Sequence, residues 1–562
     1  MPRFMAHLSI GVCALALTIF TAQAQNADTI LRNGKIYTVD KDFRTAQAVA
    51  IRDGRISAVG DDATVMKEAG PTTQIIDLAG RTVIPGLTDT HLHQSFAATN
   101  LPAVQLIEAR SVADVQQRIA ERAAQTPAGQ WIVASSGWHE SLLSEGRLPT
   151  RYELDKAAPD NPVIIPRGGH VVTVNSKALE LAGITKETKN PAGGVIVRDP
   201  ATGEATGVLL ESAAYFARKV QPPPPPPERF LELLKAQMQQ LNALGIVGVV
   251  EPGIDERIAG LYQRLRESGD MTVRTDLLYR ATSLEQVQKG LAMREMKNDD
   301  MLRFVGFKFL LDGGVEGARL REPYQIVPGE QPDKDYRGLL LLPPGGEDEW
   351  SKALQLIAEA GLQTQTHAVG DETIDVVVRN YEKVNAARPI RDLRWTVMHI
   401  FLPSDAALKT MSSLGIMATV QDHAVLLGHN QRRWWGDARA AYAIPIRKIL
   451  DAKIMTGGGS DGPVVPFDPF QSMWWMTTRQ TLNGYALGPE QAITPREALT
   501  LYTINNAILM GVEKERGSIE TGKLADIVVL SKDILAIPPA EIRDTKALMT
   551  LLGGKVVHRR EI

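Results

Sequence analysis

Eight short apolar segments that alternate with helical patterns constrain the fold of this chain more than any other feature. The helical patterns include DVQQRIAERAAQ, LELLKAQMQQLNALG and WSKALQLIAEAG. Alternation of strands and helices on this scale implies a parallel sheet with helices outside it. Eight strands suit a closed barrel. We therefore predict an α/β fold, a (β/α)8 TIM barrel over residues 85–512, with strands at 82–93, 245–253, 272–281, 303–314, 362–371, 394–400, 415–422 and 453–462.

The two ends of the chain share short β-rich runs and glycine turns. The first end contains TILRNGKIYTVD and AVAIRDGRISAVG, and the second contains GKLADIVVLSKD and KALMTLLGGKVVH. Short alternating strands with Asn-Gly and Asp-Gly turns favour hairpins. Neither end could cover its apolar face alone. We predict that residues 25–84 and 513–562 form one small β-sandwich domain.

An insertion interrupts the strand-helix rhythm after the first barrel strand. It spans residues 101–227 and has mixed elements of its own, such as GQWIVASSGW and NPVIIPRGG. Six consecutive prolines, 222–227, end it. Such a tract forms a stiff, extended spacer, which we favour over a peptide-recognition motif.

The N-terminus has the pattern of an export signal. Arg3 supplies a positive charge, an apolar run follows, and Ala22-Gln23-Ala24 is a small-residue cleavage site. The alternative is an uncleaved anchor, but the apolar run is short for a membrane span. We predict that residues 1–24 are a signal peptide and that the mature protein is periplasmic or secreted. The one cysteine, Cys13, lies inside this segment, so any metal must bind His, carboxylate or a modified Lys.

The overall charge favours small-molecule partners. A net charge of -3, a pI near 6.4 and the lack of a basic block argue against nucleic acid and against an anionic membrane surface. We expect no membrane contact after signal cleavage. The oligomeric state stays open, a homo-oligomer included.

Ionisable residues gather at the ends of the predicted barrel strands. The first strand ends in two histidines on one face, the fifth and sixth end in one histidine each, the eighth ends in an aspartate, and the fourth carries a lysine. Catalytic groups of barrels meet at the carboxyl ends of the strands. We therefore predict that six side chains converge there: His91, His93, Lys308, His367, His399 and Asp461.

These residue types suit a pair of divalent ions. Neutral imidazoles and carboxylates bind Zn²⁺, and two ions about 3.5–4 Å apart can share a hydroxide that attacks a carbonyl. Lys308 lies in the apolar run RFVGFKFLLDGG, where a buried ammonium costs several kcal/mol or more. Its uncharged amine can take up carbon dioxide and become a carbamate. We predict two divalent ions, Zn²⁺ by preference, bridged by N6-carboxylysine at Lys308.

Each of these residues could also have a plain structural role when taken alone. The His-x-His pair could be ordinary core histidines. Lys308 could form a buried ion pair with Asp312 or Glu316. Asp461 could cap a loop in GGGSDGP.

The ordered set of motifs resembles the amidohydrolase superfamily, in the branch called amidohydrolase family 3 that includes N-substituted formamide deformylases. The resemblance runs from about residue 28 to the C-terminus through PGLTDTHLH, LPTRYELDKAAPDNPV, NSKALELAGI, KFLLDGG, THAVGDETID, GGSDGPVVPFDPF and GSIETGKLADIVVL. It implies two histidines on the more buried metal, a carboxylated lysine as the bridge and two histidines on the second metal. In this sequence these are His91 and His93, then Lys308, then His367 and His399. The resemblance also implies that Asp461 is both a ligand and the proton shuttle.

The chain departs from this family pattern around the expected pocket. Met398 precedes His399 where relatives usually have glutamate, and Asp422 precedes His423 where they often have proline. The turn GWHE and the loop GVEGA also differ from the common forms. His423 and His170 stand in family-like positions, and we expect them to bind the carbonyl or another polar group of the substrate, with a structural role as the alternative.

Aromatic residues near the expected barrel mouth suggest an apolar or aromatic substrate. The alternative is that the tryptophan pairs pack the barrel rim or a subunit contact. The predicted substrate-contacting residues are Trp138, His139, Arg319, Trp434, Trp435 and Trp474, with Arg319 able to meet a carboxylate.

We therefore expect a metal-dependent hydrolase that cleaves a non-peptide C–N bond in an amide, N-acyl or N-formyl compound. Two alternatives stay open. One is an esterase, lactonase or carbamate hydrolase with the same metals, and the other is a non-catalytic periplasmic binding or regulatory protein.

Overall fold

A computed structural model describes residues 26–329 and 333–561 of the chain. The predicted signal peptide, 1–24, and Cys13 lie outside the described residues. Within the described ranges, no helix combines the length and apolar character needed to cross a membrane.

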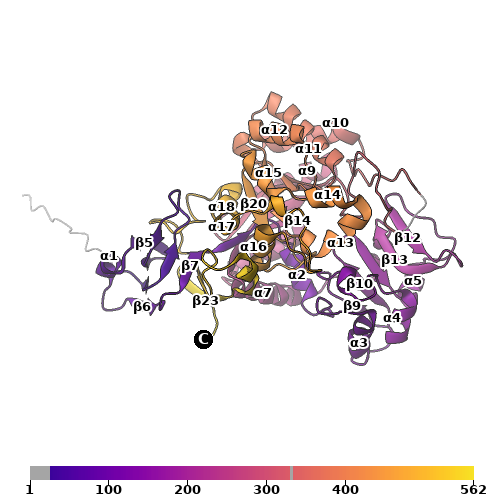
Figure 1. The fold of residues 1–562 in the computed structure, drawn as a ribbon, viewed down its shortest axis with the longest axis horizontal. Helices are drawn as coiled ribbons and strands as arrows, with labels where there is room; N and C mark the ends of the chain where they lie inside the picture. Colours follow the sequence, from indigo (N-terminus) through magenta and orange to yellow (C-terminus); the bar gives the residue numbers. More distant parts are fainter. Residues whose placement is uncertain (1–25, 330–332, 562) are drawn as a thin grey trace, which may run out of the picture.

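An eight-stranded, all-parallel sheet forms the centre of the molecule (Figure 1). Each strand pairs with the next along the chain, and Thr90 N donates to Gly458 O at 3.2 Å where the last strand meets the first. The prediction of a (β/α)8 TIM barrel is confirmed. The strands are β8 (Leu87–Asp89), β14 (Ile246–Ile254), β15 (Arg274–Arg280), β16 (Leu302–Leu310), β17 (Gln363–Ala368), β18 (Thr396–His399), β19 (Met417–Gln421) and β20 (Thr456–Gly459).

The longer helices cover the outside of the barrel because each has one apolar face. In α11 the buried side chains recur at helical spacing, as at Ile374, Val377 and Tyr381, and point to the strands. The helices between and after the strands are α2 (Gln94–Asn100), α7 (Pro227–Ala243), α8 (Glu256–Glu267), α9 (Leu284–Gly290), α10 (Gly346–Glu359), α11 (Asp371–Ala387), α12 (Asp405–Leu414), α13 (Ala424–Trp435), α14 (Asp437–Tyr442), α15 (Ile446–Asp451), α16 (Pro469–Thr478), α17 (Pro495–Leu501) and α18 (Ile504–Met510).

The first predicted strand, 82–93, is two strands in different sheets. Its first part, β7 (Thr82–Pro85), pairs with β21 (Ile527–Leu530), and only its second part, β8, belongs to the barrel. Gly86 joins them, and a Cβ at this position would lie 2.3 Å from the Val247 side chain. Glycine therefore allows the chain to pass close to the barrel as it changes sheets.

Both ends of the chain build two further sheets beside the barrel (Figure 1). Apolar side chains of the two sheets share one core, which includes Leu31, Val49, Ile527 and Leu551. One sheet has the order β5-β4-β1-β6 and the other β23-β22-β21-β7-β2-β3. Their strands are β1 (Thr29–Arg32), β2 (Lys35–Tyr37), β3 (Thr45–Ala46), β4 (Ala48–Arg52), β5 (Arg55–Gly60), β6 (Gln74–Asp77), β21 (Ile527–Leu530), β22 (Ala547–Leu552) and β23 (Lys555–Arg559).

The segment after α2 forms a five-stranded sheet of its own, in the order β12-β13-β11-β10-β9. Its elements are α3 (Val112–Ala123), β9 (Ile132–Val133), α4 (Arg151–Ala157), β10 (Val163–Arg167), β11 (Val171–Val174), α5 (Ser176–Leu181), β12 (Gly194–Arg198), β13 (Ala205–Glu211) and α6 (Ala214–Arg218). The proline tract is extended only through Pro226, because Pro227 is the first residue of α7. Proline suits that first position, where a helix has no use for its N–H.

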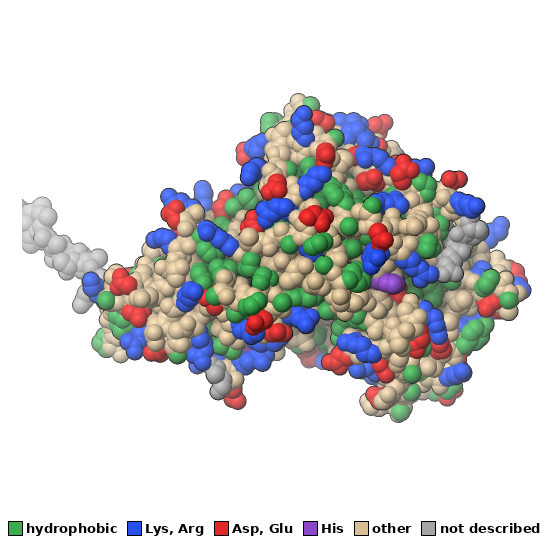
Figure 2. Space-filling model, in the orientation of Figure 1, with side chains coloured by type: hydrophobic (Ala, Val, Ile, Leu, Met, Phe, Trp, Pro, Cys, Tyr) green, Lys and Arg blue, Asp and Glu red, His purple; other side chains and the backbone are tan. Residues whose placement is uncertain are grey.

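On the face of the molecule drawn in Figure 2, charged side chains of one sign do not gather in a large patch. Figure 2 shows basic and acidic side chains interspersed over the barrel helices and the terminal sheets. This distribution agrees with the small net charge of the sequence.

Candidate metal centre and its cavity

Three buried residues at the ends of barrel strands offer donor atoms to one point. His91, His399 and Asp461 place their ligand atoms within 4.8 Å of one another. Asp461 Oδ1 lies 3.2 Å from Nε2 of His91 and 3.2 Å from Nε2 of His93. The strand ends after β8, β18 and β20 therefore bring these four predicted residues together.

The rings of His91, His399 and His367 lie side by side across the barrel mouth and form an imidazole strip. The His399 ring lies 4.7 Å from that of His91 and 4.4 Å from that of His367, between ring centroids. Hydrogen bonds fix the orientation of the rings: His399 Nδ1 pairs with Gln421 Oε1 at 2.8 Å, and His367 Nε2 pairs with Gly313 O at 3.2 Å. The same His367 Nε2 lies 3.3 Å from Asp312 Oδ1. Such outer partners are typical of metal-binding histidines.

The backbone at two of these residues is strained. His399 and Asp461 adopt φ values of 71° and 64°, in the left-handed region that non-glycine residues seldom occupy. Strain of this kind costs about 1–3 kcal/mol and tends to occur at functional sites.

Burial and neighbouring charge set the protonation of the site. Burial lowers the pKa of His91 and of His399 well below the ordinary value, and it also lowers the pKa of His367. For Asp461, burial by itself raises the pKa, but the interactions with His91 and His423 outweigh it and hold the pKa well below the ordinary value. The site therefore presents neutral imidazoles and an ionised carboxylate, the forms that bind Zn²⁺.

Lys308 lies in the same place and lacks a carboxylate partner. Burial, with a smaller effect of Arg280, lowers the pKa of Lys308 to about 7, although Asp461 opposes the shift. Its Nζ lies 2.6 Å from Met398 Sδ, and no carboxylate of the described ranges comes within 4.0 Å of it. The alternative of an ion pair with Asp312 or Glu316 is wrong, because Asp312 lies beside His367 and Glu316 pairs with Arg167.

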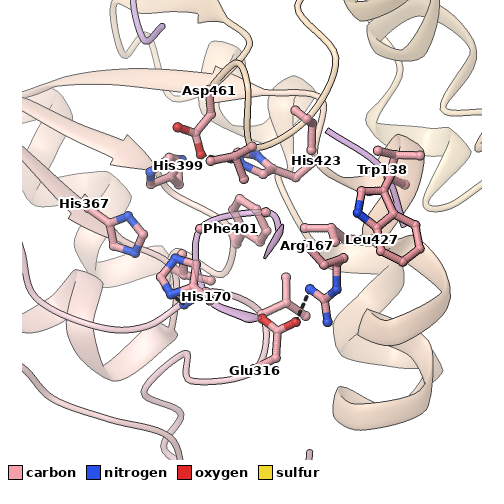
Figure 3. A pocket seen from close by; sticks show the side chains of 18 residues that line it. Trp138, Arg167, His170, Glu316, His367, His399, Phe401, His423, Leu427 and Asp461 are labelled. Atoms are coloured by element: carbon pink, nitrogen blue, oxygen red, sulfur yellow. Dashed lines mark hydrogen bonds and ion pairs between the residues drawn. The ribbon is translucent and has the colours of Figure 1, made fainter. Parts of the chain in front are cut away.

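A cavity lies directly over the imidazole strip (Figure 3). His367, His399, His423 and Asp461 line one side of it. The remaining wall is mostly apolar and is formed by Trp138, Val315, Phe401, Leu426, Leu427, Val464 and Val465, with Arg167, His170 and Glu316 as its polar members.

The two further histidines of the predicted catalytic set both reach this cavity. His423 Nε2 lies 2.9 Å from Asp461 Oδ2. His170 Nδ1 bonds to Glu211 Oε2 at 2.8 Å. Burial lowers the pKa of His170, but the charge and the hydrogen bond of Glu211 outweigh burial and raise it. A protonated His170 can donate a hydrogen bond into the cavity.

Among the predicted substrate-contacting residues, only Trp138 lines the cavity. His139 is buried behind it, where Ser141 N donates to Nδ1 and burial lowers the His139 pKa to about 4. Arg319 Nε bonds to Glu372 at 2.9 Å. The three other tryptophans pack in the core: Trp434 and Trp435 on α13, and Trp474 on α16. Packing thus accounts for these side chains.

Sequence reasoning missed two charged residues of the wall, Arg167 and Glu316. Arg167 ends the apolar strand β10, so it gave the same signal as Lys308, a charge in a buried run. Glu316 lies in the loop GVEGA, which departs from the family pattern.

The comparisons with known proteins agree with this geometry. The amidohydrolase family model matches residues 74–558. The chain belongs to the amidohydrolase family. This amidohydrolase is 31% identical over 553 residues to the N-substituted formamide deformylase of Arthrobacter pascens, a match that covers 95% of this chain and 99% of the relative.

Solved structures also resemble this amidohydrolase. An uncharacterized metal-dependent hydrolase from Pyrococcus furiosus superposes with a TM-score of 0.69 and 25% identity, over 90% of this chain and 99% of that one. Atrazine chlorohydrolase from Arthrobacter aurescens, complexed with zinc, has a TM-score of 0.52 and 14% identity, over 94% and 95% of the two chains, and shows the shared fold.

The donor set fits a divalent cation. Neutral imidazoles surround an ionised carboxylate, and the buried His91 Nδ1 has no hydrogen-bond partner in the described part of the chain. The chain is therefore a hydrolase of the C–N-cleaving amidohydrolase family with a His and Asp metal site.

Proposed function

We propose that the protein hydrolyses the C–N bond of a small N-acyl or N-formyl amide with an apolar or aromatic substituent. The observation that carries the proposal is the position of the buried imidazole and carboxylate cluster at one side of a largely apolar cavity. The formamide deformylase relative, which matches 95% of the chain, supports the same bond type.

The proposal assigns the six converging side chains to two metal positions. His91, His93 and Asp461 would hold one divalent ion, His367 and His399 the other, and Lys308, as N6-carboxylysine, both. When bound, such ions polarise a carbonyl and lower the pKa of water. Lys308 supports this assignment, because an amine with a pKa of about 7 is about half uncharged near neutral pH and can add carbon dioxide in that form.

The side chains of the cavity have separate tasks in this proposal. Asp461 accepts the proton of the attacking water and delivers it to the leaving nitrogen, which a departing amine requires. His423, 2.9 Å from Asp461 Oδ2, orients that carboxylate. A protonated His170 donates to another polar group of the substrate. The apolar wall at Phe401 and Leu427 receives the substituent.

Matched amide and ester pairs test the proposal. The purified, zinc-loaded protein should hydrolyse an N-acyl or N-formyl aromatic amine, and removal of metal with a chelator should abolish turnover. Faster turnover of the matched ester, lactone or carbamate would favour the alternative hydrolase. Absence of turnover across the whole panel would favour a non-catalytic binding protein. The further proposal that the protein acts outside the cytoplasm is tested by fractionating cells that express the full chain.

A further inference from the structure

The Glu316 carboxylate in the cavity wall accepts a side-chain hydrogen bond at only one of its two oxygens. Glu316, whose side chain is 3% exposed, accepts a hydrogen bond at Oε1 from Arg167. Its other oxygen, Oε2, has no hydrogen-bond partner within residues 26–329 and 333–561. Glu316 lines the cavity, so a ligand there can supply a donor to this oxygen, and a hydrogen bond to a charged group is stronger than a neutral one.

Arg167 fixes the position of that carboxylate. Its Nε lies 2.9 Å from Glu140 Oε2, and Glu140 Oε1 accepts from Asn430 Nδ2 at 2.8 Å. The guanidinium is thus clamped between two carboxylates, and the three groups together carry an excess negative charge. Because Glu140 lies outside the cavity lining, Glu316 presents that charge to the cavity.

The free oxygen points to the part of the cavity next to the imidazole strip. A Cβ built on Gly314 would lie 3.2 Å from Glu316 Oε2 and 2.7 Å from His170 Cδ2, so both groups border the same point. The His170 ring is in turn 6.2 Å from that of His367. Figure 3 shows the Glu316 carboxylate between Arg167 and His170, on the side of the cavity away from Asp461.

We propose that Glu316 binds the N–H of the substrate and makes the enzyme selective for secondary amides, R–CO–NH–R′, over tertiary amides and esters. This inference rests on the proposed amide hydrolysis. The C=O and N–H bonds of a trans amide lie in one plane and point in opposite directions within it. A substrate with its oxygen toward the imidazoles and Asp461 therefore turns its N–H to the wall that holds Glu316.

The other possible ligand for this oxygen is a cation, and the cavity disfavours it. The surrounding wall is formed by apolar groups such as Val315, Phe401 and Leu427, which cannot solvate a charge. A neutral N–H satisfies the carboxylate without burying a second charge. An N-methylated amide or an ester brings no donor and leaves the oxygen unpaired.

Two variants separate recognition of the N–H from damage to the ion cluster. Glu316→Gln keeps an oxygen for Arg167 but can turn an N–H donor to the cavity. Glu140→Gln changes the other partner of Arg167, outside the cavity. The probes are N-benzylacetamide, its N-methyl analogue and benzyl acetate. Their affinities are measured by calorimetry on metal-depleted protein, which does not depend on turnover, and kcat/KM is measured on zinc-loaded protein.

The wild-type protein should bind the secondary amide about 10- to 100-fold more tightly than the N-methyl analogue or the ester, the range of a hydrogen bond to a charged group. Glu316→Gln should reduce this preference to about threefold or less, and Glu140→Gln should keep it. Equal or undetectable binding of the amide pair to wild type, or a preference that survives in Glu316→Gln, would overturn the inference. Failure of hydrolysis itself gives a different result, in which the affinity preference holds but zinc-loaded protein turns over none of the probes.

Discussion

At the scale of single residues, Lys308 is the side chain whose burial is hardest to reconcile with its ordinary charged form. It is 5% exposed and has no carboxylate within 4.0 Å among the described residues. A carbamate on its amine would convert a poorly tolerated cation into a metal ligand. Two independent experiments can test the state of Lys308.

Replacement of Lys308 by alanine should remove the bridging ligand. We expect Lys308→Ala to lose the second metal ion and at least about 100-fold in rate, as is typical when an essential ligand or charge-stabilising group is lost. A short carboxylic acid such as acetate or propionate should restore part of the activity by occupying the vacated space. Metal analysis and kcat/KM check both effects. A Lys308→Ala variant with full metal content and an unchanged rate would show that Lys308 does not bridge the metal ions.

The depressed pKa of Lys308 also predicts how stability depends on pH in metal-free protein. Folded Lys308 releases its proton near pH 7, whereas the unfolded chain holds it to about 10.5. Between these values the unfolded state binds more protons, so rising pH stabilises the folded state by roughly 1 kcal/mol per pH unit. Urea unfolding in carbon dioxide-free buffer should show this gain from pH 7 to 9.5 in wild type and not in Lys308→Met. Parallel curves for the two proteins would contradict the shift.

At the scale of elements, Asp312 joins the end of β16 to the start of α11. Its carboxylate accepts hydrogen bonds from Val369 N at 3.1 Å and Gly370 N at 2.8 Å, and it lies beside His367. We predict that Asp312→Ala costs about 2–4 kcal/mol in the free energy of unfolding, because buried N–H groups lose their acceptor. It should also weaken metal binding about 10- to 100-fold, because His367 loses one of its two orienting partners.

Urea unfolding and metal titration measure the two effects of Asp312→Ala. Glu382→Ala, on the exposed face of α11, is the control and should change neither quantity. If Asp312→Ala matched this control, the hydrogen bonds of Asp312 would have no role in holding the helix or the histidine.

The elements also show what the sequence could and could not predict. The eight barrel strands were predictable because short apolar runs that end in polar residues and alternate with amphipathic helices are typical of such a barrel. The split of 82–93 into two strands was predicted only as a domain boundary after residue 84, although Pro85-Gly86 marks the break between β7 and β8 in the sequence. The tryptophans of α13 and α16 fit a substrate wall and a core equally well in sequence, and only the helix orientation decided for the core.

The wall of the cavity was harder to predict than the metal site. His91, His367, His399 and Asp461 share a rule, the strand end, that places them together. Arg167 and Glu316 are 149 residues apart and meet only because the insertion folds onto the barrel loop. No sequence periodicity predicts an ion pair between two such distant residues.

At the scale of the whole molecule, a buried ion pair joins the barrel to the terminal sheets. Arg274 of β15 donates to both oxygens of Asp526, at 2.8 and 2.9 Å, and Asp526 also accepts from Gly553 N. Asp526→Ala should cost about 3–5 kcal/mol in the free energy of unfolding, because it leaves a buried guanidinium without its main partner.

The double variant Arg274→Met/Asp526→Leu should recover at least half of that loss, because it removes both charges and fills the space with apolar atoms. Urea unfolding of the two variants measures the difference. If the single and the double variant were equally destabilised, the loss would come from the missing attraction between Arg274 and Asp526. It would not come from leaving Arg274 as an isolated buried charge.

The central claim is that six scattered side chains hold two cations at one mouth of the barrel. The most direct measurement is anomalous diffraction at the zinc edge from crystals of the zinc-loaded protein. We expect two peaks, one beside His91, His93 and Asp461 and one beside His367 and His399, with density for a carboxylated Lys308 between them. Zinc peaks elsewhere, or an unmodified Lys308 amine remote from every peak, would contradict it.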